Sequence, residues 1–533
     1  MIKTENELGA DQYKVLITTS GIGSRLGNLT DYTNKSLVSI GDKLAISYII
    51  ESYPEEVKFV VTLGYFGDHV REFLSISYPK RQFEFVEVDP YKGLGSSLAF
   101  SIIQAKYNLE IPFIYHACDT LILNEKIPTP NLNWVAGFKS KDATNYASYD
   151  TSGSLVQRFH DKGMTNFDFL HIGLVGVNDY KEFWAEIETL IADNPYDNTL
   201  NDVSVLQSLI NKGNSFTSIE FNSWADIGNS NSLTLVREKV GNKRSVLEKS
   251  EESVSFVENS VIKFFSDSEI VKNRVSRAAY LNNLIPKIES ATKNFYMYKY
   301  EQGVLASNLN DPTIITELLN WAQANLWVVN PAYNRTTFTK VCEGFYLEKT
   351  KERINLFYNS RSIKDEPSVI NGYNVPTIAE LLEETKEILL SDCRETGFHG
   401  DFILDNIIVN DRDFKLIDWR QSFGQSVQFG DIYYDISKLN HSLFINHEIV
   451  NKNLFVIEEH KKKVECGILR KDVHTLMEKN LDSFVLAQNL SLLKVKALTA
   501  IIWMNMSPLH HHPFDKFLYY YGKLNLWRAI NDL

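Results

Sequence analysis

Apolar runs alternate with amphipathic stretches over roughly the first 235 residues of the chain. Runs rich in β-branched and aromatic residues predict strands, whereas apolar positions spaced three or four residues apart predict helices. The expected strands are residues 14–18, 57–63, 83–88 and 113–117, and the expected helices are 44–52, 69–74 and 95–105. This alternation predicts an α/β domain with a doubly wound, mainly parallel sheet. Ligands bind at the carboxyl ends of such strands, so the glycine loop at Gly21 and Asp119 are expected to converge.

The pattern changes after residue 238. Residues 239–252 are charged and lack an apolar period, which predicts a junction between domains. Two short apolar runs then read as a β-hairpin, at 253–257 and 260–265, and a mostly helical pattern follows from Thr313. We therefore expect a first domain over 1–238 and a second, α+β domain over 253–533, with lobes at about 253–305 and 306–533.

Composition narrows the class of protein. The chain has 533 residues and a formal net charge of −12, which argues against sequence-independent binding of nucleic acid. No apolar run approaches the roughly 18 residues of a membrane span. The four cysteines lack disulfide or metal-ligand spacing, which indicates reduced thiols in a cytoplasmic protein. The partners expected are small-molecule substrates, and the sequence is compatible with a homo-oligomer.

A glycine loop follows the first predicted strand. Gly21 and Gly23, with Ser24, allow backbone N–H groups to approach phosphates without obstruction by a Cβ atom. Arg25 adds a fork-shaped donor for a triphosphate, and Lys35 is ten residues further on. Together these residues predict a nucleotide-phosphate site.

Residues 21–38, from Gly21-Ile22-Gly23 to Lys35-Ser36-Leu37-Val38, resemble the signature loop of sugar-phosphate nucleotidyltransferases, and the resemblance extends over about residues 12–236. It implies magnesium ligation by Asp119 and by Asp226 in Trp224-Ala225-Asp226-Ile227-Gly228. It also implies base recognition by Gly95 and Ser96, and acceptor contacts by Lys162, His171 and Gly173. Asn28 and Asn34 replace prolines that are usual in the loop.

The resemblance implies that an acceptor phosphate oxygen attacks the α-phosphorus of a nucleoside triphosphate and that pyrophosphate leaves. Mg²⁺ between Asp119 and Asp226 neutralises the developing charge in such a reaction, and Arg25 and Lys35 stabilise the departing pyrophosphate. The nucleotide, whether CTP, UTP or GTP, stays open.

A second motif lies near the other end of the chain, where His399-Gly400-Asp401 is followed by Asn406 and, after a predicted hairpin, by Asp418. This spacing presents an aspartate base, Asp401, and then two groups, Asn406 and Asp418, that can share Mg²⁺.

This segment resembles the aminoglycoside phosphotransferase and choline kinase-like family, which has a two-lobed, protein-kinase-like fold, over about residues 250–533. The resemblance implies that Asp401 orients or deprotonates a substrate hydroxyl and that Lys263 contacts the phosphates of ATP. Arg420 is a candidate acceptor contact, while Asp431 and Asp435 are expected to brace the catalytic loop.

The two motifs in one chain predict consecutive reactions. In the first interpretation, the second domain phosphorylates a sugar with ATP at the anomeric hydroxyl, and the first domain makes an NDP-sugar for surface polysaccharide or cell-wall precursors. In the alternative, choline or another amino alcohol is phosphorylated and converted to a CDP-alcohol. In a third interpretation, one half is a degenerate binding or regulatory module. The expected metal ligands and the catalytic aspartate are all present, which argues against it: Asp119, Asp226, Asp401, Asn406 and Asp418.

Overall fold

The computed structural model describes residues 7–241, 251–461 and 463–531. The chain forms two compact units. The first comprises Met1–Ser268 and Glu289–Tyr298, and the second comprises Glu269–Ile288 and Lys299–Leu533. Most of the predicted junction, residues 242–250, lies outside the described residues. The predicted domain boundaries remain predictions.

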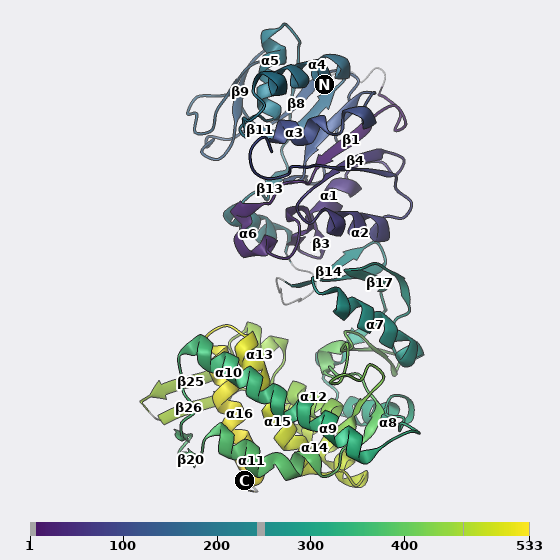
Figure 1. The fold of residues 1–533 in the computed structure, drawn as a ribbon, viewed down its shortest axis with the longest axis vertical. Coiled ribbons are helices and arrows are strands. Elements are labelled where there is room, and N and C mark those ends of the chain that lie inside the picture. Colours follow the sequence, from purple (N-terminus) through teal and green to yellow (C-terminus); the bar gives the residue numbers. More distant parts are fainter. Residues whose placement is uncertain (1–6, 242–250, 462, 532–533) are drawn as a thin grey trace. The chain divides into compact units, whose positions relative to one another are not determined.

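A nine-stranded sheet organises the first unit, in the order β5-β4-β1-β6-β11-β8-β12-β10-β9. Figure 1 labels β4, β1, β11, β8 and β9 of this sheet. Its strands are β5 (Phe83–Glu87), β4 (Lys58–Leu63), β1 (Lys14–Thr18), β6 (Phe113–Ala117), β11 (Phe169–Val177), β8 (Trp134–Phe138), β12 (Thr217–Glu220), β10 (Leu155–His160) and β9 (Ser148–Ser152). The four strands predicted from the sequence are β5, β4, β1 and β6, and they run parallel to one another.

The rest of this sheet is mixed, which corrects the expectation of a mainly parallel sheet. β11 runs antiparallel to both β6 and β8, while β12 runs parallel to β8. A parallel pair needs a crossover connection, usually a helix, and none of the described elements between β6 and β11 is helical. The helices α4 (Tyr180–Asp193) and α5 (Asp202–Asn211) make the crossover that leads to β12.

Helices cover both faces of the sheet, as expected for a doubly wound domain. Along β1, Val15 and Ile17 enter one core with α1 (Ala45–Glu51) and α2 (Gly67–Ser77). Leu16, which points the other way, enters a second core with α3 (Leu98–Ile103), α4 and α5.

A smaller sheet follows in the chain, in the order β14-β15-β17-β16. The predicted hairpin is confirmed as β14 (Glu252–Val257) and β15 (Ser260–Phe265); β16 is Ile288–Ala291 and β17 is Phe295–Lys299. Phe264 and Phe295 join the core around α2, with ring centroids 5.1 Å from His69 and 5.9 Å from Phe73 respectively. By their contacts, β14, β15 and most of β17 therefore belong to the first unit.

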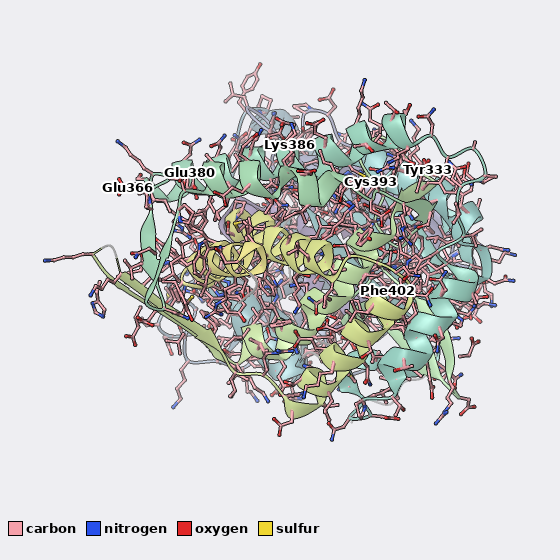
Figure 2. The ribbon with its side chains drawn as sticks, turned by 90° about the horizontal axis from the view of Figure 1, so that it is seen from below. Tyr333, Glu366, Glu380, Lys386, Cys393 and Phe402 are labelled. Carbon is pink, nitrogen blue, oxygen red and sulfur yellow. The ribbon has the colours of Figure 1, made fainter. Side chains whose placement is uncertain are left out.

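The second unit is mainly helical, as the pattern after Thr313 predicts. Its helices are α7 (Ser268–Leu281), α8 (Ile314–Asn325), α9 (Arg335–Glu343), α10 (Lys349–Arg361), α11 (Ile378–Leu390), α12 (Ile432–Phe444), α13 (His447–Asn451), α14 (Asp472–Ala487), α15 (Leu492–Met506) and α16 (Phe514–Ile530). A capping box of Thr377 and Glu380 begins α11, on which Figure 2 labels Glu380 and Lys386.

Short hairpins complete the second unit. β22 (Ile407–Asn410) pairs with β23 (Asp413–Leu416) and with β18 (Val304–Leu305), and β25 (Phe455–His460) pairs with β26 (Lys463–Ile468). No helix among the described residues is long and apolar enough to cross a membrane.

Candidate functional sites

The glycine loop turns sharply at Gly23, whose φ of 72° lies in the left-handed region. A Cβ atom at Gly23 would lie 2.8 Å from Lys35 Cβ and 3.2 Å from Thr30 Cγ2, so a larger residue would displace the lysine. Gly21 and Ser24 are exposed on the same loop.

Asn34, which replaces the usual proline, anchors the residue before Lys35. Its Nδ2 donates hydrogen bonds to the carbonyl oxygens of Thr19 (2.7 Å) and Tyr65 (2.6 Å), and its Oδ1 accepts from the Ser36 N–H (2.9 Å). A buried side chain with these bonds takes over the restraint on the backbone that a proline ring would provide.

Lys35 points at Asp119, with 3.0 Å between Nζ and Oδ2. Burial alone lowers the pKa of the Lys35 ammonium, but the Asp119 carboxylate outweighs it and raises that pKa above its usual value. Burial alone raises the pKa of Asp119, and Lys35 together with Arg25 brings it below its usual value. Both side chains are therefore charged at neutral pH.

Asp226 reaches the same place from another strand. β13 (Trp224–Asp226) pairs antiparallel with β7 (Thr120–Ile122), which sets Asp226 opposite Thr120, the residue after Asp119. Its carboxylate accepts hydrogen bonds from Tyr146 Oη (2.9 Å) and from the Gly228 N–H (3.0 Å). Burial and the neighbouring Asp119 carboxylate raise the pKa of Asp226.

Gly228 marks the point where the predicted residues meet. A Cβ atom there would lie 3.0 Å from Asp226 Oδ1, 3.2 Å from Asp119 Oδ2 and 3.6 Å from Arg25 Nη2. Two carboxylates that share one site repel each other, and a divalent cation relieves that repulsion. The donor set of Asp119 and Asp226 therefore fits Mg²⁺.

Gly173 lies beside this site, at a break in the register between β11 and β8. Its φ is 69°, and a Cβ atom would lie 2.8 Å from the Cβ atom of Ala117, at the end of β6. Gly95 and Ser96 occupy the loop before α3, where the Gly95 N–H bonds Asn198 Oδ1 at 2.7 Å. Lys162 is exposed in the loop after β10.

His171 is engaged within the protein. Its Nε2 lies 2.7 Å from Asp202 Oδ2, and its ring packs edge-on against Phe159. Nδ1 is buried and has no hydrogen-bond partner. Only Nδ1 is therefore left for the predicted acceptor contact.

In the second unit, two side chains hold the Asp401 carboxylate. Lys438 Nζ lies 2.7 Å from Oδ1, and Asn406 Nδ2 lies 3.1 Å from Oδ2. Burial alone raises the pKa of Asp401, but Lys438 outweighs it and holds that pKa well below its usual range. Asn406 donates through Nδ2, so its Oδ1 is the atom left for a cation.

Asp418 follows β23 with a φ of 59°, and its Oδ1 lies 3.6 Å from Arg274 Nη1. Its side chain keeps 31% of its surface exposed, unlike the buried Asn406. A carboxylate and an amide oxygen are ligand types that suit Mg²⁺.

The backbone of the loop around His399, Gly400 and Asp401 is held from two sides. Asp435 on α12 accepts from the N–H groups of His399 and Gly400, each at 2.7 Å, and burial raises its pKa to about 6. Arg277 on α7 donates to the carbonyl oxygens of Phe398 (2.5 Å), His399 (3.3 Å) and Arg420. Asp435 thus braces the loop, as its position in the sequence suggested.

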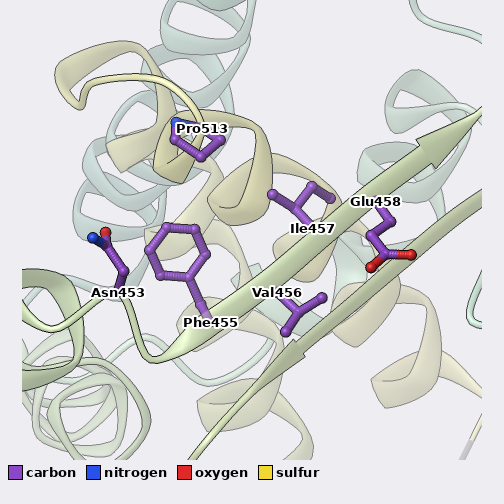
Figure 3. A pocket seen from close by; sticks show the side chains of 6 residues that line it. All are labelled: Asn453, Phe455, Val456, Ile457, Glu458 and Pro513. Atoms are coloured by element: carbon purple, nitrogen blue, oxygen red, sulfur yellow. The ribbon is translucent and has the colours of Figure 1, made fainter.

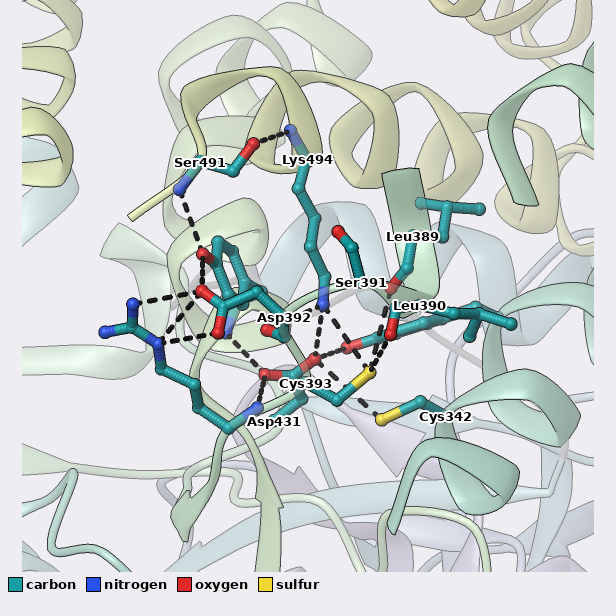
Figure 4. A network of polar contacts seen from close by, with 12 residues as sticks. Cys342, Leu389, Leu390, Ser391, Asp392, Cys393, Asp431, Ser491 and Lys494 are labelled. Carbon is teal, nitrogen blue, oxygen red and sulfur yellow. Dashed lines mark hydrogen bonds and ion pairs between the residues drawn. The ribbon is translucent and has the colours of Figure 1, made fainter. Parts of the chain in front are cut away.

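Asp431 is part of a buried polar network (Figure 4). Its Oδ2 lies 3.2 Å from Lys494 Nζ and accepts from Tyr346 Oη at 2.9 Å, and its Oδ1 accepts from the Arg394 N–H at 3.1 Å. Lys494 also lies 3.6 Å from Cys393 Sγ. Asp431 therefore braces the start of α12.

Arg420 lies next to Gly400 in the loop that carries Asp401. Its Nε donates to the Ser422 carbonyl oxygen (3.0 Å), and its guanidinium lies over the Phe345 ring at 5.2 Å. Lys263 is buried on β15, in the first unit, and its contact with ATP remains a prediction.

Sequence reasoning missed Lys438 and Lys349. Lys438 carries no motif of its own, but it lies three residues after Asp435 and thus on the same face of α12.

A shallow hollow elsewhere in the second unit, of about 380 Å³, is lined by Asn453, Phe455, Val456, Ile457, Glu458 and Pro513 (Figure 3). None of the predicted site residues lines it.

No family model and no curated protein sequence matches the chain. Its N-terminal part is similar to solved structures of nucleotidyltransferases. The CTP:phosphocholine cytidylyltransferase from Streptococcus pneumoniae is 18% identical, with a TM-score of 0.37 over 43% of this chain and 100% of that chain. The inositol-1-phosphate CTP transferase from T. maritima is 17% identical, with a TM-score of 0.35 over 45% and 99%.

A putative glucose-1-phosphate thymidylyltransferase from Bacillus anthracis is 16% identical, with a TM-score of 0.36 over 45% of this chain and 98% of that chain. Matches with identities and TM-scores this low do not indicate a reaction for this chain.

Proposed function

We propose that the chain is a bifunctional enzyme. The second unit phosphorylates a small hydroxylated substrate with ATP, and the first unit joins the resulting phosphate ester to a nucleoside triphosphate, with release of pyrophosphate. The product we favour is an NDP-sugar. The observation that carries the proposal is the meeting of Asp119, Asp226 and Arg25 around Gly228, beside Lys35.

In the first reaction site, Arg25 and Lys35 bind the β- and γ-phosphates and stabilise the charge that develops on pyrophosphate. Mg²⁺ held by Asp119 and Asp226 supplies charge neutralisation when it is bound. Gly21, Gly23 and Ser24 offer backbone donors to the phosphates, while Gly95 and Ser96 face the base. Lys162, His171 and Gly173 are the proposed acceptor contacts.

In the second reaction site, the acceptor hydroxyl oxygen attacks the γ-phosphorus of ATP, the bond to ADP breaks, and the hydroxyl proton passes to Asp401. Lys438 holds the pKa of Asp401 low, which makes it a weak base. Its main role is therefore to orient the hydroxyl, as expected for a loose transition state. Asn406 and Asp418 would hold Mg²⁺, which would neutralise charge on the phosphates, and Arg420 contacts the acceptor.

The test separates the two halves with matched isosteric variants. Asp226→Asn is expected to lower nucleotidyl transfer at least about 100-fold and to leave phosphorylation unchanged, and Asp401→Asn is expected to do the reverse. Both reactions are followed by mass spectrometry with ATP, Mg²⁺, all NTPs and a panel of sugars and amino alcohols.

Retention of nucleotidyl transfer by Asp226→Asn would refute the first site, and retention of phosphorylation by Asp401→Asn would refute the second. A CDP-alcohol as the only nucleotide product would move the enzyme to the amino-alcohol class.

A further inference from the structure

A group of basic side chains surrounds the Asp401 site. Lys438 pairs with Asp401, and Arg420 packs against the loop, because a Cβ atom on Gly400 would lie only 2.6 Å from Arg420 Cβ. Lys349, on the first turn of α10, lies over the same Phe345 ring as Arg420, with Nζ 4.3 Å from the ring centroid. Phe345 therefore brings two cations together beside the catalytic loop.

Arg353 lies four residues after Lys349 on α10 and thus on the same face of that helix. Lys438 pairs with the Asp401 carboxylate, but among the described residues Lys349, Arg353 and Arg420 have no ion-pair partner. Burial, followed by the nearby charges of Arg420, Arg353 and Lys438, lowers the pKa of Lys349 to about 6, and Glu352 only partly offsets them. Cations held close together without partners are costly, unless an anion binds between them.

The same arrangement disfavours a cationic acceptor. A quaternary ammonium binds against free aromatic faces, but Lys349 and Arg420 already lie over Phe345. Unpaired protein cations would also repel an amino alcohol or an amino sugar.

We infer that the acceptor phosphorylated at Asp401 is an anionic hydroxylated molecule, whose carboxylate or phosphate group is bound by Lys349, Arg353 and Arg420. This inference rests on the proposed kinase function and names the substrate class of that site. Arg420 and Arg353 offer fork-shaped donors that match either anion, and a bound anion would raise the pKa of Lys349 and so restore its point charge. Lys349 and Arg353 are thereby specificity-determining residues.

The experiment compares ligands that share one ring and differ in charge. The whole protein, with Mg²⁺ and a non-hydrolysable ATP analogue, is titrated calorimetrically with glucose, glucosamine, glucuronate and glucose 6-phosphate, and also with choline. We expect at least one of the two acids to bind about tenfold or more tightly than glucose, and the two cations to bind most weakly. The two acids distinguish a carboxylate from a phosphate as the group recognised.

Variants locate the effect. Lys349→Met and Arg353→Met are expected to remove most of the preference for the anion without changing the affinity for the ATP analogue. Lys351→Met is the matched control, because Lys351 is on the same helix but is exposed and pairs with Glu348. The inference is overturned if glucosamine or choline binds as tightly as the acids, if neither acid binds, or if Lys349→Met weakens only the ATP analogue.

Turnover of the same compounds separates this inference from the function on which it rests. Phosphorylation of choline or glucosamine in preference to the acids would support the kinase function and refute the anionic acceptor. Charge-selective binding without phosphorylation of any compound would refute the proposed kinase function and support only an anion-binding site.

Discussion

Single residues in the first site are held by side chains that a sequence motif does not reveal. The glycine loop, Arg25 and Lys35 were recognisable in the sequence because all of them lie within one short segment. Asn34 looked like a departure from the pattern, yet its amide ties together Thr19, Tyr65 and Ser36. Its role depends on residues that are distant in sequence, and for that reason it could not be predicted.

Asn34→Ala should lower kcat/KM for nucleotidyl transfer about tenfold, because the residue before Lys35 loses four side-chain hydrogen bonds. Phosphorylation should be unaffected. Steady-state kinetics of both reactions check this, with the exposed Asn28→Ala as control. Equal losses of both activities would point instead to global unfolding.

Lys349 couples stability to pH. Its pKa is about 6 in the folded chain, against roughly 10.4 for an unperturbed lysine. Between these values the unfolded chain binds more protons, so the stability contributed by this residue rises with pH across that window.

Lys349→Met removes the free-energy cost of burying this lysine next to other cations. The variant should melt about 2–4 °C higher than the parent protein at pH 7, and the gap should close towards pH 10. Thermal unfolding at several pH values measures it, with Lys351→Met as the control. A gap that does not change with pH would contradict the assignment of the charge cluster.

At the scale of elements, α12 connects the parts of the second site. Asp431 caps the helix, Asp435 binds the N–H groups of His399 and Gly400, and Lys438 binds the Asp401 carboxylate. The motif from His399 to Asp418 was predictable because its spacing is local. The pairing of Asp401 with Lys438 was not, because only the packing of α12 brings the two residues together.

Asp435→Ala leaves the N–H groups of His399 and Gly400 buried without acceptors, at a cost of about 2–4 kcal/mol in unfolding free energy. The loop should lose its geometry, and kcat for phosphorylation should fall at least about 100-fold. Denaturant unfolding and kinase kinetics test both effects. The exposed Asp472→Ala serves as control, and an unchanged kcat in Asp435→Ala would refute the bracing role.

For the whole molecule, the sequence predicted the parallel half of the main sheet correctly because each strand there is a continuous apolar run followed by a helix. The mixed half was missed, since its direction depends on which strands pair after β6 and not on local composition. The packing of β14, β15 and β17 against the core around α2 was not predicted either, because it joins residues that are far apart in the sequence.

The small sheet should contribute to the stability of the first unit. Phe295→Ala removes a side chain that is 1% exposed and contacts Phe73, which should cost about 3–5 kcal/mol. Calorimetry should show a lower melting temperature for the unfolding of the first unit in Phe295→Ala. Tyr107→Ala, at a site 84% exposed, should change that temperature little. If Phe295→Ala melts like the parent protein, the small sheet does not stabilise this unit.

The chain passes between the two units three times, at residues 268, 288 and 298, before the second unit is completed. During synthesis, the core of the first unit is therefore incomplete when residue 241 leaves the ribosome; it is complete only when Phe295 has emerged as well. Completion of the first unit is thus delayed relative to the synthesis of most of its residues, and translation stalled between residues 241 and 295 would leave that unit unfinished.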